Sequence, residues 1–162
     1  MLKYSDYDIT CSEVPDEISL TFSVTNCGAR CKGCHSPWLQ EDIGLPLFPA
    51  VKRLTETYKS LISCVCFLGE GQDTEEMVTI LKWLNDNYPH LKLALYSGKN
   101  SIPQPIMEYL NYYKVGAYVE ELGALDSPLT NQRFYLREGS KDILLNHKFR
   151  RSHNDQNSND RG

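Results

Sequence analysis

The sequence lacks a long apolar run. The longest such stretches, for example Leu91–Tyr96, are far shorter than the about 20 residues that cross a bilayer. Met1–Thr10 has no apolar segment of the kind found in secretory signals and contains two Asp residues. These features predict a cytoplasmic protein with no membrane partner.

An excess of positive charge is also lacking. Lys and Arg number 17 against 21 Asp and Glu, which gives a formal net charge of −4. Proteins that mainly bind nucleic acid neutralise phosphates with Lys and Arg, so we expect no nucleic-acid partner. The 162 residues allow one domain, predicted over residues 1–149. Residues 150–162 are polar, without apolar periodicity, and are expected to form a disordered tail.

Cysteine is present in an informative pattern. The chain has six, and Cys27, Cys31 and Cys34 lie close together. Without an export signal, clustered thiols indicate metal binding or catalysis before disulfides. Cys64 and Cys66 alternate along an apolar run, and we interpret them as buried structural thiols.

Short β-rich runs alternate with amphipathic stretches along the chain. The predicted strands are Asp8–Val14, Ile18–Val24, Ile62–Leu68, Leu91–Tyr96 and Val115–Val119, and the predicted helices are Pro49–Tyr58, a helix capped by Asp73, and Gln104–Tyr113. The first two strands are expected to form a hairpin across Pro15, Asp16 and Glu17. The later alternation favours an α/β fold with a parallel sheet and crossover helices, whose chemistry lies in loops after the strands.

The spacing of the clustered cysteines is Cys-x3-Cys-x2-Cys, with Gly28 and Gly33 between them. A structural zinc site requires four ligands, whereas three thiolates on one compact loop suit an iron–sulfur cubane with one open iron. The alternative is a zinc site completed by Cys11, Cys64, Cys66 or a distant His. Spacing favours the iron–sulfur interpretation but leaves zinc open.

The chain resembles a known family at several motifs. The cysteine triplet after an early strand is similar to the cluster motif of radical S-adenosylmethionine enzymes. More narrowly, the chain resembles the activating proteins of anaerobic ribonucleoside-triphosphate reductase. The motifs that carry this resemblance are Cys31–Pro37, Phe67–Glu70, Tyr96–Lys99, Tyr118–Gly123, Asp126–Pro128 and Thr130–Arg133. In the family two consecutive glycines precede the acid, whereas here Gly69 and Gly71 flank Glu70.

The resemblance implies a fold and an activity. The fold would be a compact partial (β/α) barrel of mostly parallel strands with crossover helices. The enzyme would be a radical SAM oxidoreductase that binds a [4Fe–4S] cluster through Cys27, Cys31 and Cys34. It would cleave S-adenosylmethionine reductively and generate a glycyl radical on the reductase. An electron donor such as flavodoxin or ferredoxin would be a second partner.

The resemblance also implies cofactor contacts, each with a simpler alternative. Glu70, with Gly69 before it, would receive the methionine ammonium; the alternative is a solvated turn carboxylate or a helix-capping charge before Asp73. Ser97 and Gly98 would approach the methionine carboxylate or the ribose; the alternative is an ordinary turn between a strand and a helix.

Three further residues are candidate cofactor contacts. The His35 backbone would meet the adenine edge, or His35 is an exposed loop residue. Asn131 or Arg133 would reach the cofactor or the partner's glycine loop, or both belong to a capped turn.

Three other functions remain open. The chain could activate a different glycyl-radical enzyme or act on a small molecule by radical chemistry. It could instead be a zinc-stabilised binding module without catalysis.

Overall fold

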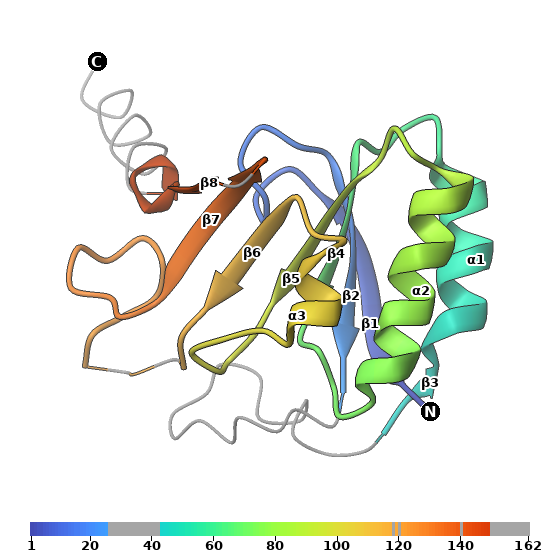
Figure 1. Cartoon of the computed structure of the whole chain (residues 1–162), viewed down its shortest axis with the longest axis horizontal. Coiled ribbons are helices and arrows are strands. Elements are labelled where there is room, and N and C mark those ends of the chain that lie inside the picture. Colours follow the sequence, from blue (N-terminus) through green and yellow to red (C-terminus); the bar gives the residue numbers. More distant parts are fainter. Residues whose placement is uncertain (26–42, 118, 120, 140, 150–162) are drawn as a thin grey trace.

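The computed structural model describes residues 1–25, 43–117, 119, 121–139 and 141–149. These residues are organised around one mixed β-sheet. Within these residues the sheet has eight strands in the order β3-β1-β2-β4-β5-β6-β7-β8 (Figure 1). The strands are β1 (Lys3–Thr10), β2 (Ser19–Val24), β3 (Leu45–Pro46), β4 (Cys64–Leu68), β5 (Lys92–Tyr96), β6 (Tyr112–Val115), β7 (Arg133–Glu138) and β8 (Lys141–Leu144). The helices are α1 (Leu47–Tyr58), α2 (Thr74–Asn87) and α3 (Gln104–Met107).

The centre of the sheet is parallel. β2 pairs with β4, β4 with β5, and β5 with β6, all in the same direction. The strands are buried on both sides, as expected for parallel strands that read as near-continuous apolar runs. Their carboxyl ends therefore meet at one edge of the sheet.

The expectation of a partial barrel of mostly parallel strands is wrong. β1 pairs antiparallel with both β2 and β3, and β7 pairs antiparallel with both β6 and β8, so the sheet is mixed and predominantly antiparallel by pairing. β3 and β8 lie at opposite edges of an open sheet. For the β1–β2 and β7–β8 pairs the physical reason is connection length: residues 11–18 and 139–140 are too few for a crossover, which needs a dozen or more residues.

The hairpin predicted at the start of the chain is confirmed, although its first strand occupies Lys3–Thr10 instead of Asp8–Val14. A helix begins at Gln104 as predicted, but its predicted end at Tyr113 and the predicted strand Val115–Val119 are wrong. The helix ends at Met107, and the strand is β6. Asn111 explains the change, because its backbone and side chain both bond Leu93 and draw the following tyrosines into the sheet.

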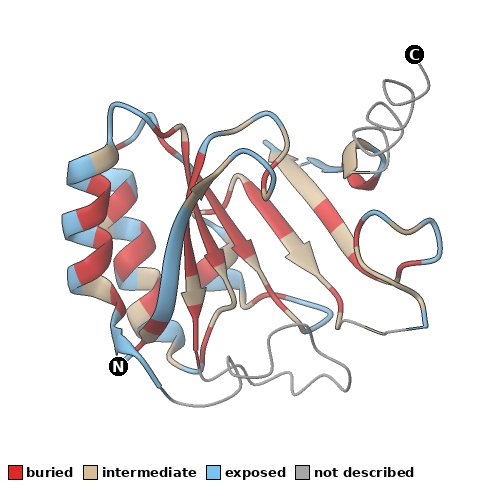
Figure 2. Ribbon diagram, turned by 180° about the vertical axis from the view of Figure 1, so that it is seen from behind, coloured by how far each residue is buried: buried red, intermediate tan, exposed pale blue. Residues whose placement is uncertain are grey.

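One face of the sheet is covered by the helices (Figures 1 and 2). α1 and α2 turn their buried stripes toward alternate residues of the central strands, among them Leu20, Phe22 and Phe67. Phe22 and Phe67 stack with ring centroids 5.8 Å apart. The spacing of Met77, Ile80, Leu81 and Leu84 predicted this stripe, and all four are fully buried.

The opposite face is covered by connecting segments, which contribute Val14, Leu125 and Leu145 to a second core. Val14, Cys64, Cys66 and Phe134 form its core, and each is fully buried. Burial raises the pKa of the Cys64 thiol to about 12 and raises that of Cys66 as well, so both remain protonated at neutral pH. The interpretation of Cys64 and Cys66 as buried thiols is confirmed.

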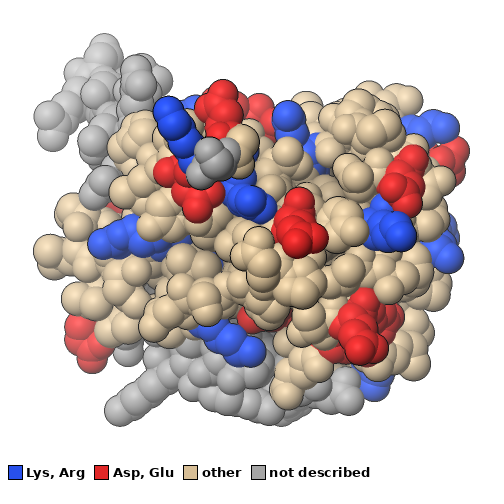
Figure 3. Space-filling model, in the orientation of Figure 1, with Lys and Arg blue, Asp and Glu red and all other residues tan. Residues whose placement is uncertain are grey.

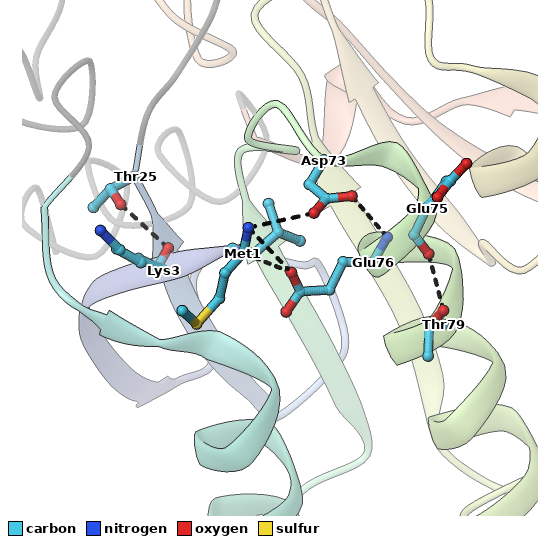
Figure 4. Close-up of polar contacts among 8 residues, drawn as sticks. Met1, Lys3, Thr25, Asp73, Glu75, Glu76 and Thr79 are labelled. Carbon is cyan, nitrogen blue, oxygen red and sulfur yellow. Dashed lines mark hydrogen bonds and ion pairs between the residues drawn. The ribbon is translucent and has the colours of Figure 1, made fainter.

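The start of α2 is tied to the first residues of the chain (Figure 4). Asp73 caps the helix by accepting from the Glu76 backbone N–H at 3.0 Å, as predicted. The Glu76 carboxylate does not close a reciprocal capping box; it accepts from the Leu2 backbone N–H at 2.7 Å. The Met1 amino nitrogen lies 3.4 Å from Asp73 Oδ2. These contacts hold the β4–α2 connection against β1.

Within the described residues, each helix is too short or too polar to cross a membrane. On the face drawn in Figure 3, acidic and basic side chains are interspersed. The absence of a nucleic-acid partner stays a prediction.

We expect Asp73→Ala to lower the free energy of unfolding by about 1 kcal/mol, because α2 loses the acceptor for an otherwise unpaired N–H. Asp73→Asn keeps an acceptor and should cost less. Urea unfolding of both variants measures the difference. Equal losses would show that the charge of Asp73, rather than its hydrogen bond, stabilises the helix start.

Glu13 makes stability depend on pH. Burial raises the pKa of its carboxyl, and Lys114 opposes that shift. In the unfolded chain Glu13 loses its proton near the ordinary carboxyl pKa of about 4.3, whereas in the folded protein it keeps the proton to a higher pH. The free energy of unfolding therefore falls as pH rises from the unfolded pKa to the raised folded pKa. We expect Glu13→Gln to remove that fall, measured by urea unfolding from acid to neutral pH. Exposed Glu138→Gln is the control; an identical pH dependence in both variants would contradict the assignment.

Candidate functional site

The carboxyl ends of the parallel strands bring three connections together. Ser23, Leu68, Tyr96 and Lys114 lie side by side in the strand register. The residues that follow them therefore meet at one edge: the β4–α2 connection from Gly69, the β5–α3 connection from Ser97, and the segment after β6. This edge contains predicted cofactor contacts from two separate sequence motifs.

Glu70 is held between two glycines with positive φ angles. Gly69 has a φ of 113° and Gly71 a φ of 66°. A Cβ at Gly69 would lie 3.2 Å from the Val24 backbone oxygen, and one at Gly71 would lie 2.5 Å from Leu2 Cδ2. The glycines let the connection pack closely on the end of β2. Both glycines flanking the acid are therefore required by the backbone.

The Glu70 carboxylate is nearly buried, with its side chain 10% exposed. The Ser97 hydroxyl donates to Glu70 Oε1 at 2.9 Å, and Lys99 Nζ lies 3.7 Å from the same oxygen. The alternative of a solvated turn carboxylate is wrong, because a solvated side chain would be open to water. Glu70 also does not cap α2, a role that Asp73 fills.

Ser97 joins the two connections. It is 1% exposed, and its hydroxyl also accepts from the Lys99 backbone N–H at 3.1 Å. Its own N–H donates to the Lys114 carbonyl. Gly98 follows in the same turn and is partly buried. The structure thus brings Gly69, Glu70, Ser97 and Gly98 together at this edge.

The end of β6 carries the second group of predicted contacts. Gly116 N–H donates to the Lys99 carbonyl at 2.7 Å, and a Cβ at Gly116 would lie 3.0 Å from the Asn131 backbone oxygen. Asn131 Nδ2 donates to the Ala117 carbonyl at 3.0 Å. Asn131 Oδ1 is buried and accepts no hydrogen bond within the described residues. An acceptor buried in this way is available to a ligand donor.

Arg133 fits the capped-turn alternative instead. Its Nη1 donates to the carbonyls of Thr130 at 2.6 Å and Gln132 at 2.9 Å. Gln132, predicted only as part of a polar trio, is buried and bonds the Gly116 carbonyl at 3.4 Å. The guanidinium closes the turn before β7.

The predicted metal ligands Cys27, Cys31 and Cys34, and the predicted contact His35, lie outside the described residues. The segment that contains them follows Thr25 and precedes Ile43. Thr25 Oγ1 donates to the Ile43 carbonyl at 2.6 Å, so both ends of that segment meet. A Cβ at Gly71 would lie 3.6 Å from the Thr25 oxygen, which places this junction beside the Glu70 connection.

Residues that the sequence interpretation missed complete the edge. Lys99 and Gly116 were not predicted as site residues, although Lys99 is the last residue of the Tyr96–Lys99 motif. Among the described residues, no group of three or more His, Cys, Asp or Glu side chains is arranged to hold a metal ion. The described part of the edge therefore offers a carboxylate, a hydroxyl, an amine and an amide rather than a metal cage.

Comparisons of the chain with protein-family models, with curated proteins and with solved structures give no match.

We expect Gly69→Ala to lower the free energy of unfolding by about 1–3 kcal/mol, because its φ of 113° is strained for a residue with a Cβ and the Val24 oxygen is close. Gly139→Ala is the matched control: its φ is 63° and nothing lies within 4 Å of the added Cβ. Urea unfolding should show the larger loss at Gly69. The reverse order would mean that the Gly69 backbone relaxes freely.

Proposed function

We propose that the chain is a cytoplasmic radical SAM activase that generates a glycyl radical on an anaerobic ribonucleoside-triphosphate reductase. A single observation carries the proposal. The nearly buried Glu70 carboxylate, bonded by Ser97, lies in a connection that packs against Thr25, where the cysteine-containing segment begins. A carboxylate suited to an ammonium and a segment suited to an iron–sulfur cluster therefore adjoin.

The donor set suits the implied cofactors. Three thiolates in Cys-x3-Cys-x2-Cys spacing would hold a [4Fe–4S] cluster with one iron open to a ligand. When bound, the reduced cluster and S-adenosylmethionine supply a 5′-deoxyadenosyl radical that removes a hydrogen atom from a glycine Cα of the partner. The chain itself supplies binding, orientation and exclusion of water.

Glu70 would bind the methionine ammonium through a charge-assisted hydrogen bond. The contacts that described residues make to its carboxylate both fall on Oε1, which leaves Oε2 for the ligand. Ser97 holds the carboxylate in one orientation. Asn131 Oδ1 would accept from a hydroxyl or amino group of the same ligand, since it is buried and lacks a donor among the described residues.

The cluster assignment is tested by replacing each thiolate. We expect Cys27→Ala, Cys31→Ala and Cys34→Ala to abolish reductive cleavage of S-adenosylmethionine, because a cubane cannot be held by two protein ligands and stay intact. Anaerobically purified protein is assayed for iron, sulfide and 5′-deoxyadenosine. Cys11→Ala, at an exposed cysteine, is the control. A protein that contains only zinc, and loses it in Cys11→Ala, would establish the binding-module alternative.

Glu70→Gln tests the ammonium contact. We expect the Kd for S-adenosylmethionine to rise about 10- to 100-fold, the cost of losing a hydrogen bond to a charged group, while the iron content stays unchanged. Glu75→Gln, at an exposed position in α2, is the control for removing a negative charge. Unchanged affinity in Glu70→Gln would remove Glu70 from the site.

The partner is tested by electron paramagnetic resonance. Mixing the reduced protein, S-adenosylmethionine and the glycyl-radical subunit of an anaerobic ribonucleotide reductase should give a glycine-centred doublet. Cleavage of S-adenosylmethionine without a doublet would favour another glycyl-radical enzyme or a small-molecule substrate.

A further inference from the structure

The Glu70 carboxylate already has a cation beside it. Lys99 Nζ lies 3.7 Å from Glu70 Oε1. The two side chains differ in exposure: that of Glu70 is 10% exposed, whereas that of Lys99 is 53% exposed. The carboxylate is thus fixed inside the site, and the amine reaches it from the solvent side.

The backbone of Lys99 is fixed even though its side chain is half exposed. Its N–H donates to Ser97 Oγ at 3.1 Å, and its carbonyl accepts from Gly116 N–H at 2.7 Å. The hydroxyl that receives the Lys99 N–H is the one that donates to Glu70. The backbone of this turn therefore positions the Lys99 side chain beside the Glu70 carboxylate.

The distances indicate that Ser97 binds the Glu70 carboxylate more strongly than Lys99 does. At 2.9 Å the Ser97 contact is a full hydrogen bond, whereas 3.7 Å for Lys99 is beyond hydrogen-bond length and is an ion pair. A nearly buried carboxylate requires a neighbouring donor or cation. A half-exposed ammonium that leaves such a pair regains water around it, which offsets the loss of the pair. Lys99 can therefore leave without dismantling the turn.

We infer that Lys99 is an internal competitor for the ligand ammonium: it neutralises Glu70 in the ligand-free protein and is displaced when the ammonium of S-adenosylmethionine binds. This inference rests on the proposed function. Two cations cannot both pair closely with one nearly buried carboxylate without repelling each other. Lys99 would then weaken binding of any ligand that carries an ammonium and leave ligands without one unaffected.

The test compares ligands with and without the amino-acid portion. Wild type and Lys99→Gln, both with reconstituted cluster under anaerobic conditions, are titrated calorimetrically with S-adenosylmethionine. We expect Lys99→Gln to bind about two- to fivefold more tightly, a modest gain because the Lys99 side chain is half exposed and solvent weakens its pair with Glu70. 5′-Methylthioadenosine, which has no ammonium, should bind both proteins equally.

Two further variants isolate the contact. Lys92→Gln removes the same charge at the opposite end of β5, where the residue is exposed, and should leave the Kd unchanged. In a Glu70→Gln background, Lys99→Gln should give no gain, because the carboxylate for which Lys99 competes is gone. Lys99→Met, which keeps an apolar stem, replaces Lys99→Gln if the latter fails to fold by thermal melting.

The outcomes separate this inference from the proposed function. Weaker or unchanged binding of S-adenosylmethionine by Lys99→Gln, with binding by wild type intact, overturns the competition and makes Lys99 a ligand contact or a bystander. An equal gain in the Glu70→Gln background also overturns it. If cluster-loaded wild type does not bind S-adenosylmethionine at all, the proposed function fails and the competition with its ammonium fails with it.

Discussion

The site depends on the parallel pairing of β2, β4, β5 and β6, because that pairing brings connections from distant parts of the chain to one edge. Glu70 and Ser97 are separated by 27 residues yet share a 2.9 Å hydrogen bond. The bond requires the strands that precede the two residues to end at the same level. The buried apolar side chains of the central strands fix this register, because a shift of one residue would turn each side chain to the other face of the sheet.

The antiparallel flanks add residues that a parallel core alone would not supply. β7 returns beside β6 and places Asn131 against the end of that strand, next to Gly116. On the other side, β1 lies against β2 and contacts the start of α2 through Glu76. These strands lock the loops at the edge from both sides.

The Glu70 carboxylate illustrates why a charge is retained at low exposure. Burial of a carboxylate without partners is costly, and here Ser97 and Lys99 both face the same oxygen. The remaining oxygen is what a ligand would use. Cys64 and Cys66 show the opposite case, because burial raises their thiol pKa values and makes them unreactive. The same sheet thus holds one carboxylate at its edge among polar partners and two thiols in its apolar core.

Local pattern in the sequence determined α2, its cap at Asp73, the first hairpin and the central strands, because periodicity and capping chemistry act over a few residues. Glu70 and Ser97 were singled out by the resemblance to a known family and not by local pattern. Only the tertiary structure decided that the sheet is mixed, that Tyr112–Val115 is a strand and that Arg133 closes a turn. The contact between Lys99 and Glu70 was likewise found only in the tertiary structure. Strand direction and side-chain neighbours depend on contacts between residues far apart in the chain, and those contacts are set by packing of the whole sheet rather than by any short stretch of sequence.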